Sequence, residues 1–158
     1  MIPVRIHSLG LDQTTNQPVI LLREEDGVRV LPIWIGHPEA TAILIAIEGV
    51  EAPRPMTHDL LLASILAAGH QIERVEITRL EEGTFYAALV LRGEERTVVV
   101  DARPSDSIAV AVRAGCPILV AEAVMQESAV IPDEAEEEEV EKFRDFLEQV
   151  DPEDFAQS

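Results

Sequence analysis

Residues 96–115, RTVVVDARPSDSIAVAVRAG, contain two different apolar runs, one before Pro104 and one after it. The β-branched run before Pro104 predicts a strand over residues 97–102. The small apolar residues after it predict a buried helix that ends at Gly115. Arg113 falls in the last turn, where the helix dipole favours a cation. The stretch therefore predicts a strand that leads directly into a buried helix.

The same plan of strand, proline, acidic residue, apolar helix and glycine occurs at residues 29–49, RVLPIWIGHPEATAILIAIEG. Short strands joined by polar turns precede each copy, so each copy completes a β-meander. The expected strands before and within the copies are 4–8, 19–22, 28–36, 72–80, 84–91 and 97–102. Pro32 marks its strand as an edge or a bulge. The pattern predicts an α+β fold of largely antiparallel meanders packed with apolar helices.

Two more helices that end at glycines are predicted, one over residues 37–49 within this second stretch and one over residues 57–69. Pro38 lies in the first turn of the first helix, and Thr57 is the expected N-cap of the second. Both helices are apolar around most of their circumference. They are therefore expected to lie between layers of the protein or in a subunit interface.

The sequence changes character after Pro132. It becomes acidic, and its apolar residues follow a helical spacing that predicts an amphipathic helix. These apolar residues are Val140, Phe143, Phe146, Leu147 and Val150. We therefore divide the chain into one domain over residues 1–131 and an acidic C-terminal helical extension over residues 132–158.

The chain has the length of one ordinary domain, with 158 residues and a hydrophobic fraction of 47%. Cys116 is the single cysteine, so no internal disulfide can form, which fits a reducing compartment. The N-terminus has no basic leader followed by an apolar core, and no apolar stretch reaches the roughly 20 residues of a membrane span. The expected location is the cytoplasm, without a membrane partner.

The formal net charge of −18 opposes binding of polyanions at long range. A nucleic-acid substrate therefore needs a local arginine cluster or a divalent cation. The sequence has no Gly-rich phosphate loop and no HExxH, CxxC or GxSxG motif. Polar groups gather instead at the starts of the apolar helices. Among the histidines, His58 is the strongest functional candidate, because it begins a helix that is otherwise nearly free of polar groups.

Helix N-termini attract anions, and an arginine beside one can hold a phosphate with two hydrogen bonds. Arg54 and Arg103 both precede predicted helices. The alternative is that Ser105, Asp106 and their counterparts merely cap the helix ends. Taken alone, the local sequence favours capping.

Three ordered motifs change that balance: LPIWIGHPEATAI (31–43), RPMTHDLL (54–61) and VDARPSDSIAVAVRAGCPILV (100–120). Together they resemble the bifunctional nuclease domain family of bacteria and plants over about residues 1–131, and the C-terminal segment is similar to the extension common in bacterial members. The resemblance implies an α+β fold, a homo-oligomer, and a nuclease that acts on DNA and RNA.

Phosphodiester hydrolysis needs an activated water and neutralisation of charge on the phosphate, which carboxylate-bound Mg²⁺ or Mn²⁺ can supply. Within the matching motifs we assign the expected roles on chemical grounds. The catalytic residues are His58, Asp59 and Asp106; the phosphate-binding residues are Arg54, Arg103 and Ser105; the metal ligands are Asp101, Asp106 and Glu39.

Other interpretations of these residues and helices stay open at this point. Asp101 and Asp106 would equally well pair with Arg103 and close the corner between strand and helix as a salt-bridge network. Cys116 fits a small buried residue better than a nucleophile. The surplus of apolar helix fits a non-catalytic oligomeric interaction module, and the helix ends fit a sensor of small anionic ligands.

Overall fold

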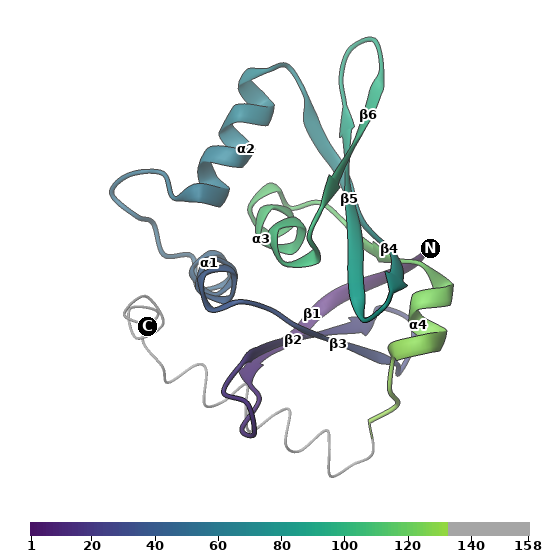
Figure 1. The fold of residues 1–158 in the computed structure, drawn as a ribbon. Coiled ribbons are helices and arrows are strands. Elements are labelled where there is room, and N and C mark those ends of the chain that lie inside the picture. Colours follow the sequence, from purple (N-terminus) through teal and green to yellow (C-terminus); the bar gives the residue numbers. More distant parts are fainter. Residues whose placement is uncertain (133–158) are drawn as a thin grey trace.

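The structure is a computed structural model and describes residues 1–132. Its strands are β1 (Ile2–Leu11), β2 (Pro18–Glu24), β3 (Val30–Trp34), β4 (Gln71–Glu81), β5 (Thr84–Arg92), β6 (Thr97–Ala102) and β7 (Ile118–Val120). Its helices are α1 (His37–Ile47), α2 (Thr57–Ala67), α3 (Pro104–Ala114) and α4 (Glu122–Ser128). Figure 1 shows how the helices and strands are arranged.

The strands form one sheet in the order β3-β2-β1-β7-β4-β5-β6, which confirms the predicted α+β fold. Each meander is antiparallel, and Pro32 lies in the edge strand β3, where a missing amide hydrogen is tolerated. The sequence did not reveal β7. This short strand runs antiparallel to β1 and parallel to β4, and so joins the two meanders at the centre of the sheet.

The hairpin between β4 and β5 depends on the dipeptide Glu82-Gly83. Both residues have positive φ angles, 50° and 78°. Such a turn has the twist that two neighbouring antiparallel strands require, and glycine adopts it without a steric penalty. The tight turn sets the register that continues into β6, and β6 leads into α3.

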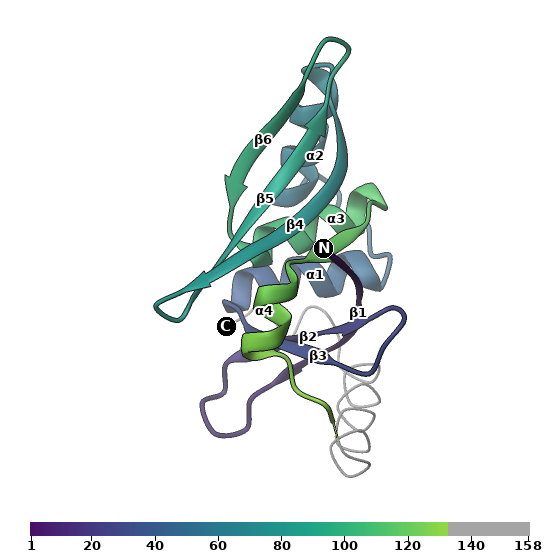
Figure 2. The same cartoon turned by 90° about the vertical axis from the view of Figure 1, so that its right-hand side faces the viewer.

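The helix predicted in the opening stretch is α3, and it lies at the centre of the molecule. In Figures 1 and 2 it lies among α1, α2 and the strands β4 and β5. Ile108, Ala109 and Val110 are fully buried, and Gly115 ends the helix in the left-handed conformation. The prediction of a buried helix closed by glycine is confirmed.

The other long apolar helix, α2, is only partly covered within the described residues. His58 is its one buried residue, whereas Leu60 is 58% exposed and Leu66 is 52% exposed. The fold therefore does not place α2 between two layers, as α3 is placed. The remaining expectation for this helix, a subunit interface, stays a prediction.

The predicted amphipathic helix lies outside the described residues, as does almost all of the extension from residue 132 onward. Over residues 1–132, no helix is both long and apolar enough to cross a membrane.

Candidate functional site

A cleft of about 390 Å³ lies where the first turns of α1, α2 and α3 approach one another. Its walls come from segments that are far apart in the sequence. The lining residues are Pro38, Glu39, Thr41, Ala42, Ile45, Met56, Thr57, His58, Arg103, Asp106 and Arg113. The cleft thus collects Glu39, His58, Arg103 and Asp106, four of the residues predicted from the sequence.

These four side chains are connected by consecutive hydrogen bonds that involve charged groups. The His58 Nε2 atom lies 2.9 Å from Oδ1 of Asp106. Arg103 donates from Nε to Oδ2 of Asp106 at 2.8 Å and from Nη2 to Oε1 of Glu39 at 2.8 Å. All three helices therefore contribute a side chain to one polar network.

The charge of Asp106 determines the tautomer of His58. Burial raises the pKa of the Asp106 carboxyl, but the hydrogen bonds from Arg103 and His58 outweigh burial and hold that pKa below its usual value. Asp106 is therefore ionised at neutral pH and can only accept hydrogen bonds. In the neutral imidazole, Nε2 must then carry the proton, and Nδ1 is the basic nitrogen.

The Nδ1 atom of His58 remains accessible although the residue is only 7% exposed. Within residues 1–132, no hydrogen bond engages this nitrogen. In the same part of the chain, no buried side-chain nitrogen or oxygen lacks a hydrogen-bond partner. An unpartnered Nδ1 must therefore touch solvent, and His58 lines the cleft. The arrangement provides a proton acceptor held in place by a carboxylate.

Arg103 combines strong anchoring with high exposure. Its side chain is 65% exposed. The hydrogen bonds to Asp106, and then those to Glu39, raise the pKa of its guanidinium. A guanidinium has five N–H groups, so the two that bind carboxylates leave others for a ligand in the cleft. Arg103 can therefore hold an anionic group next to His58.

Arg113 lines the cleft and also holds its three helices together, a role that the sequence analysis missed. Its side chain, 8% exposed, donates to Oδ1 of Asp59 at 2.7 Å and to the carbonyl oxygens of Ala109 and Ala42 at 2.8 and 3.0 Å. These bonds join α3 to α2 and α1. The signal in the sequence was an arginine inside a helix of small apolar residues, which we interpreted only as a partner of the helix dipole.

Asp59 accepts two hydrogen bonds from groups of α2 and α3. Its Oδ1 accepts from Arg113, and its Oδ2 accepts from the backbone amide of Met56 at 2.9 Å. These bonds, the one from Arg113 first, lower the pKa of the Asp59 carboxyl. Asp59 does not line the cleft. Its position suits a residue that fixes the start of α2.

Three further predicted site residues, besides Asp59, lie outside the cleft. Asp101 is in register with Ala88 on β5, and strand alternation turns it away from the core that its neighbour Ala102 packs against. Arg54 is exposed in the link between α1 and α2, and Ser105 is buried in the first turn of α3. None of the three lines the cleft.

The capping interpretation is confirmed for Asp59, which accepts from the amide of the N-cap of α2, but it is wrong about which residues are the N-caps. Met56 rather than Thr57 is the N-cap of α2, and Arg103 rather than Ser105 or Asp106 is the N-cap of α3. Pro104 explains the second shift, because proline favours the first helical position and leaves the preceding residue outside the helix. Asp106 is thus free to bind side chains from other elements.

The predicted metal ligands do not form a metal site as they are arranged here. Asp101 is on the other face of the sheet, and Glu39 and Asp106 both bind the cation of Arg103. Over residues 1–132, no three His, Cys, Asp or Glu side chains are grouped so that they could hold an ion. A divalent ion between Glu39 and Asp106 would have to displace Arg103. Dependence on Mg²⁺ or Mn²⁺ stays a prediction.

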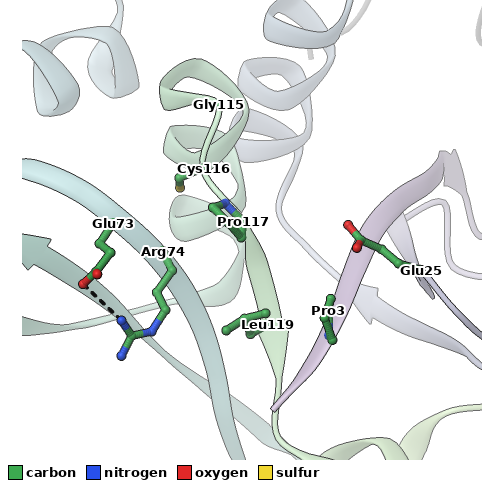
Figure 3. Close-up of a pocket in the computed structure, with 8 residues that line it drawn as sticks. All are labelled: Pro3, Glu25, Glu73, Arg74, Gly115, Cys116, Pro117 and Leu119. Atoms are coloured by element: carbon green, nitrogen blue, oxygen red, sulfur yellow. Dashed lines mark hydrogen bonds and ion pairs between the residues drawn. The ribbon is translucent and has the colours of Figure 1, made fainter.

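A second hollow, of about 680 Å³, lies near the junction of β1, β7 and β4 and contains none of these residues. Figure 3 shows Cys116 on its wall, with the paired side chains of Glu73 and Arg74. Burial raises the pKa of the Cys116 thiol. A neutral thiol is a weak nucleophile, so the structure favours the structural interpretation of Cys116.

Comparisons with known proteins agree with this chain's sequence motifs. The family model described as "Bifunctional nuclease domain" matches residues 20–133. An uncharacterized protein of Mycobacterium tuberculosis (strain H37Rv) is 52% identical over 96% of this chain and 96% of its own length.

Plant relatives carry the nuclease name. Bifunctional nuclease 1 of Oryza sativa subsp. japonica is 28% identical over 69% of this chain, and bifunctional nuclease 1 of Arabidopsis thaliana is 30% identical over 65% of it. The matches span 34% and 33% of these plant proteins. Because the family model spans most of the chain, this protein belongs to the bifunctional nuclease domain family.

Proposed function

We propose that this protein hydrolyses phosphodiester bonds of single-stranded RNA and DNA in the cleft between α1, α2 and α3. The observation that carries the proposal is the chain from His58 through Asp106 to Arg103, which places a proton acceptor and a cation side by side. The nuclease name of the plant relatives supports the choice of substrate.

The proposed reaction begins with the nucleophilic oxygen of a water molecule in the cleft. Nδ1 of His58 takes its proton as the oxygen attacks phosphorus. Asp106 stabilises the imidazolium that forms, and Arg103 stabilises the added negative charge on the phosphate oxygens. The imidazolium then returns the proton to the leaving oxygen as the bond from phosphorus to that oxygen breaks.

The proposal assigns no step to a metal ion, since Arg103 occupies the carboxylates that would bind one. Purified protein is therefore expected to cleave end-labelled single-stranded oligonucleotides at the same rate in excess EDTA as in Mg²⁺. Asp101→Ala is the matched control and should retain activity, because Asp101 is outside the cleft. Activity that disappears in EDTA and returns with Mg²⁺ or Mn²⁺ would contradict the metal-free site, and activity in neither condition would contradict the function.

Glu39 competes with substrate for Arg103 in this scheme. Glu39→Gln removes that competing charge and is expected to lower KM for an oligonucleotide about two- to five-fold, because an ion pair with an exposed arginine contributes about 1 kcal/mol or less. Steady-state kinetics at fixed salt measure the change. Glu48→Gln, at the other end of α1, removes the same charge without touching Arg103. An equal drop in KM for both variants would show a general charge effect and contradict this role of Glu39.

A further inference from the structure

We propose that the C-terminal segment 140–150 of this chain docks on the sheet surface that β1, β2 and β3 turn away from the core. We call this surface the outer face. It includes the side chains of Arg5, Val19, Leu21, Arg23, Pro32 and Trp34, which share one side of the three strands by register. Ser8 and Val30 lie on the same side and are buried. The proposal is independent of catalysis in the cleft.

The outer face is unusually apolar for the exposed side of a sheet. Along β2, Ile20 and Leu22 are fully buried in the core, so the residues between them point the other way. Those residues are Val19 and Leu21, where a sheet facing water would carry polar side chains. Trp34, in register with Val19, is 49% exposed. An apolar surface of this kind usually marks a contact.

No described helix accounts for this surface. Val19 and Leu21 neither belong to the hydrophobic core nor pack against it within residues 1–132. Figure 1 shows α1 on the opposite side of β1, β2 and β3. The cover must come from beyond residue 132 or from another molecule.

The chain leaves the described region next to the outer face. Val130 forms a β-bridge with Val30 at the start of the edge strand β3, and Ile131, the next residue, is 69% exposed. The seven residues between Pro132 and Val140 give eight steps along the chain, which can extend about 26 Å. Two strand spacings, from β3 across β2 to β1, require only about 10 Å. The segment can therefore reach the outer face of its own chain.

The segment also has the complementary pattern. Its apolar residues, Val140 to Val150, would extend over about 15 Å on one side of the predicted helix, within the length of the seven-residue strand β2. Residues 133–158 carry twelve acidic residues against Lys142 and Arg144. Arg5 and Arg23 lie directly opposite each other on the outer face. Apolar residues would meet apolar residues, and acidic residues beside the apolar stripe would lie near this arginine pair.

Trp34 is the single tryptophan of the chain and reports directly on this face. In the full-length protein, Phe143→Ala/Phe146→Ala should shift Trp34 emission to longer wavelength and strengthen quenching by acrylamide, because the ring loses its cover. Phe155→Ala is the control: it removes a phenyl ring from the same C-terminal extension but outside segment 140–150, and should leave the emission unchanged. Circular dichroism should show that all variants keep the fold.

Two results would overturn the proposal. If the double variant leaves Trp34 unchanged, or Phe155→Ala has the same effect, the apolar residues of 140–150 do not cover this face. If Trp34 quenching in the unaltered protein depends on protein concentration and follows the mass measured by light scattering, the face is covered by a second copy rather than by the same chain.

Discussion

His58→Ala is expected to lower the rate of oligonucleotide cleavage by about 10²- to 10⁴-fold, the usual contribution of one general acid–base group. The imidazole is the proton acceptor in the cleft, with Nδ1 open to solvent and Nε2 held by Asp106. Arg103 does not contact His58 through any described hydrogen bond, so it keeps its carboxylate partners. The loss should therefore appear in kcat, with a much smaller change in KM.

Asp106→Asn tests the same site with a smaller change of shape. The amide cannot balance an imidazolium, so kcat should fall toward the value of His58→Ala, and the double variant should be no worse than the poorer single variant. His70→Ala is the control. His70 follows the C-terminal end of α2, whereas His58 is in the first turn, and the His70 ring binds the carbonyl of Ala68. Near-normal cleavage by both His58→Ala and Asp106→Asn, with the fold intact, would remove the basis of the proposed function.

The sequence predicts the fold well where local signals are strong. Alternating strands, the Glu82-Gly83 turn and the glycine ends of the helices all carry their own conformational preferences. β7 was missed because three apolar residues after Pro117 have no period of their own. Its place between β1 and β4 comes from tertiary pairing, which no local pattern encodes.

The candidate site was predictable in its residue types and in the pair of Arg103 with Asp106, which are close in sequence, but not in its distant pairs. Glu39 and Arg103 are 64 positions apart and meet only because α1 packs beside α3. Asp101 was assigned to the site because it is a carboxylate within a matching motif, yet strand alternation turns it to the other face. Arg113 could be seen as an unusual charge in an apolar helix, but its three partners become evident only from the packing of three helices.

Arg113→Met is expected to lower the free energy of unfolding by about 2–4 kcal/mol, which corresponds to a drop of very roughly 5–15 °C in melting temperature. Methionine keeps the apolar stem but removes every hydrogen bond of the buried guanidinium. Asp59 loses its cationic partner, and the carbonyls of Ala42 and Ala109 lose their donor. Denaturant titration at pH 7 measures the loss.

Arg103→Met is the matched control, because it removes the same group from a side chain that is 65% exposed and should cost about 1 kcal/mol or less.

The dependence of stability on pH provides an independent check. The pKa of Asp59 in the folded protein lies below its usual 3.8, so its ion pair contributes stability above about pH 4 and loses that contribution as the pH falls through the folded pKa. The gap in stability between the unaltered protein and Arg113→Met should therefore narrow on acidification. If Arg113→Met costs no more than Arg103→Met, or if the gap is the same at every pH, then Arg113 does not hold α2 to α3, and the position of His58 depends on other contacts.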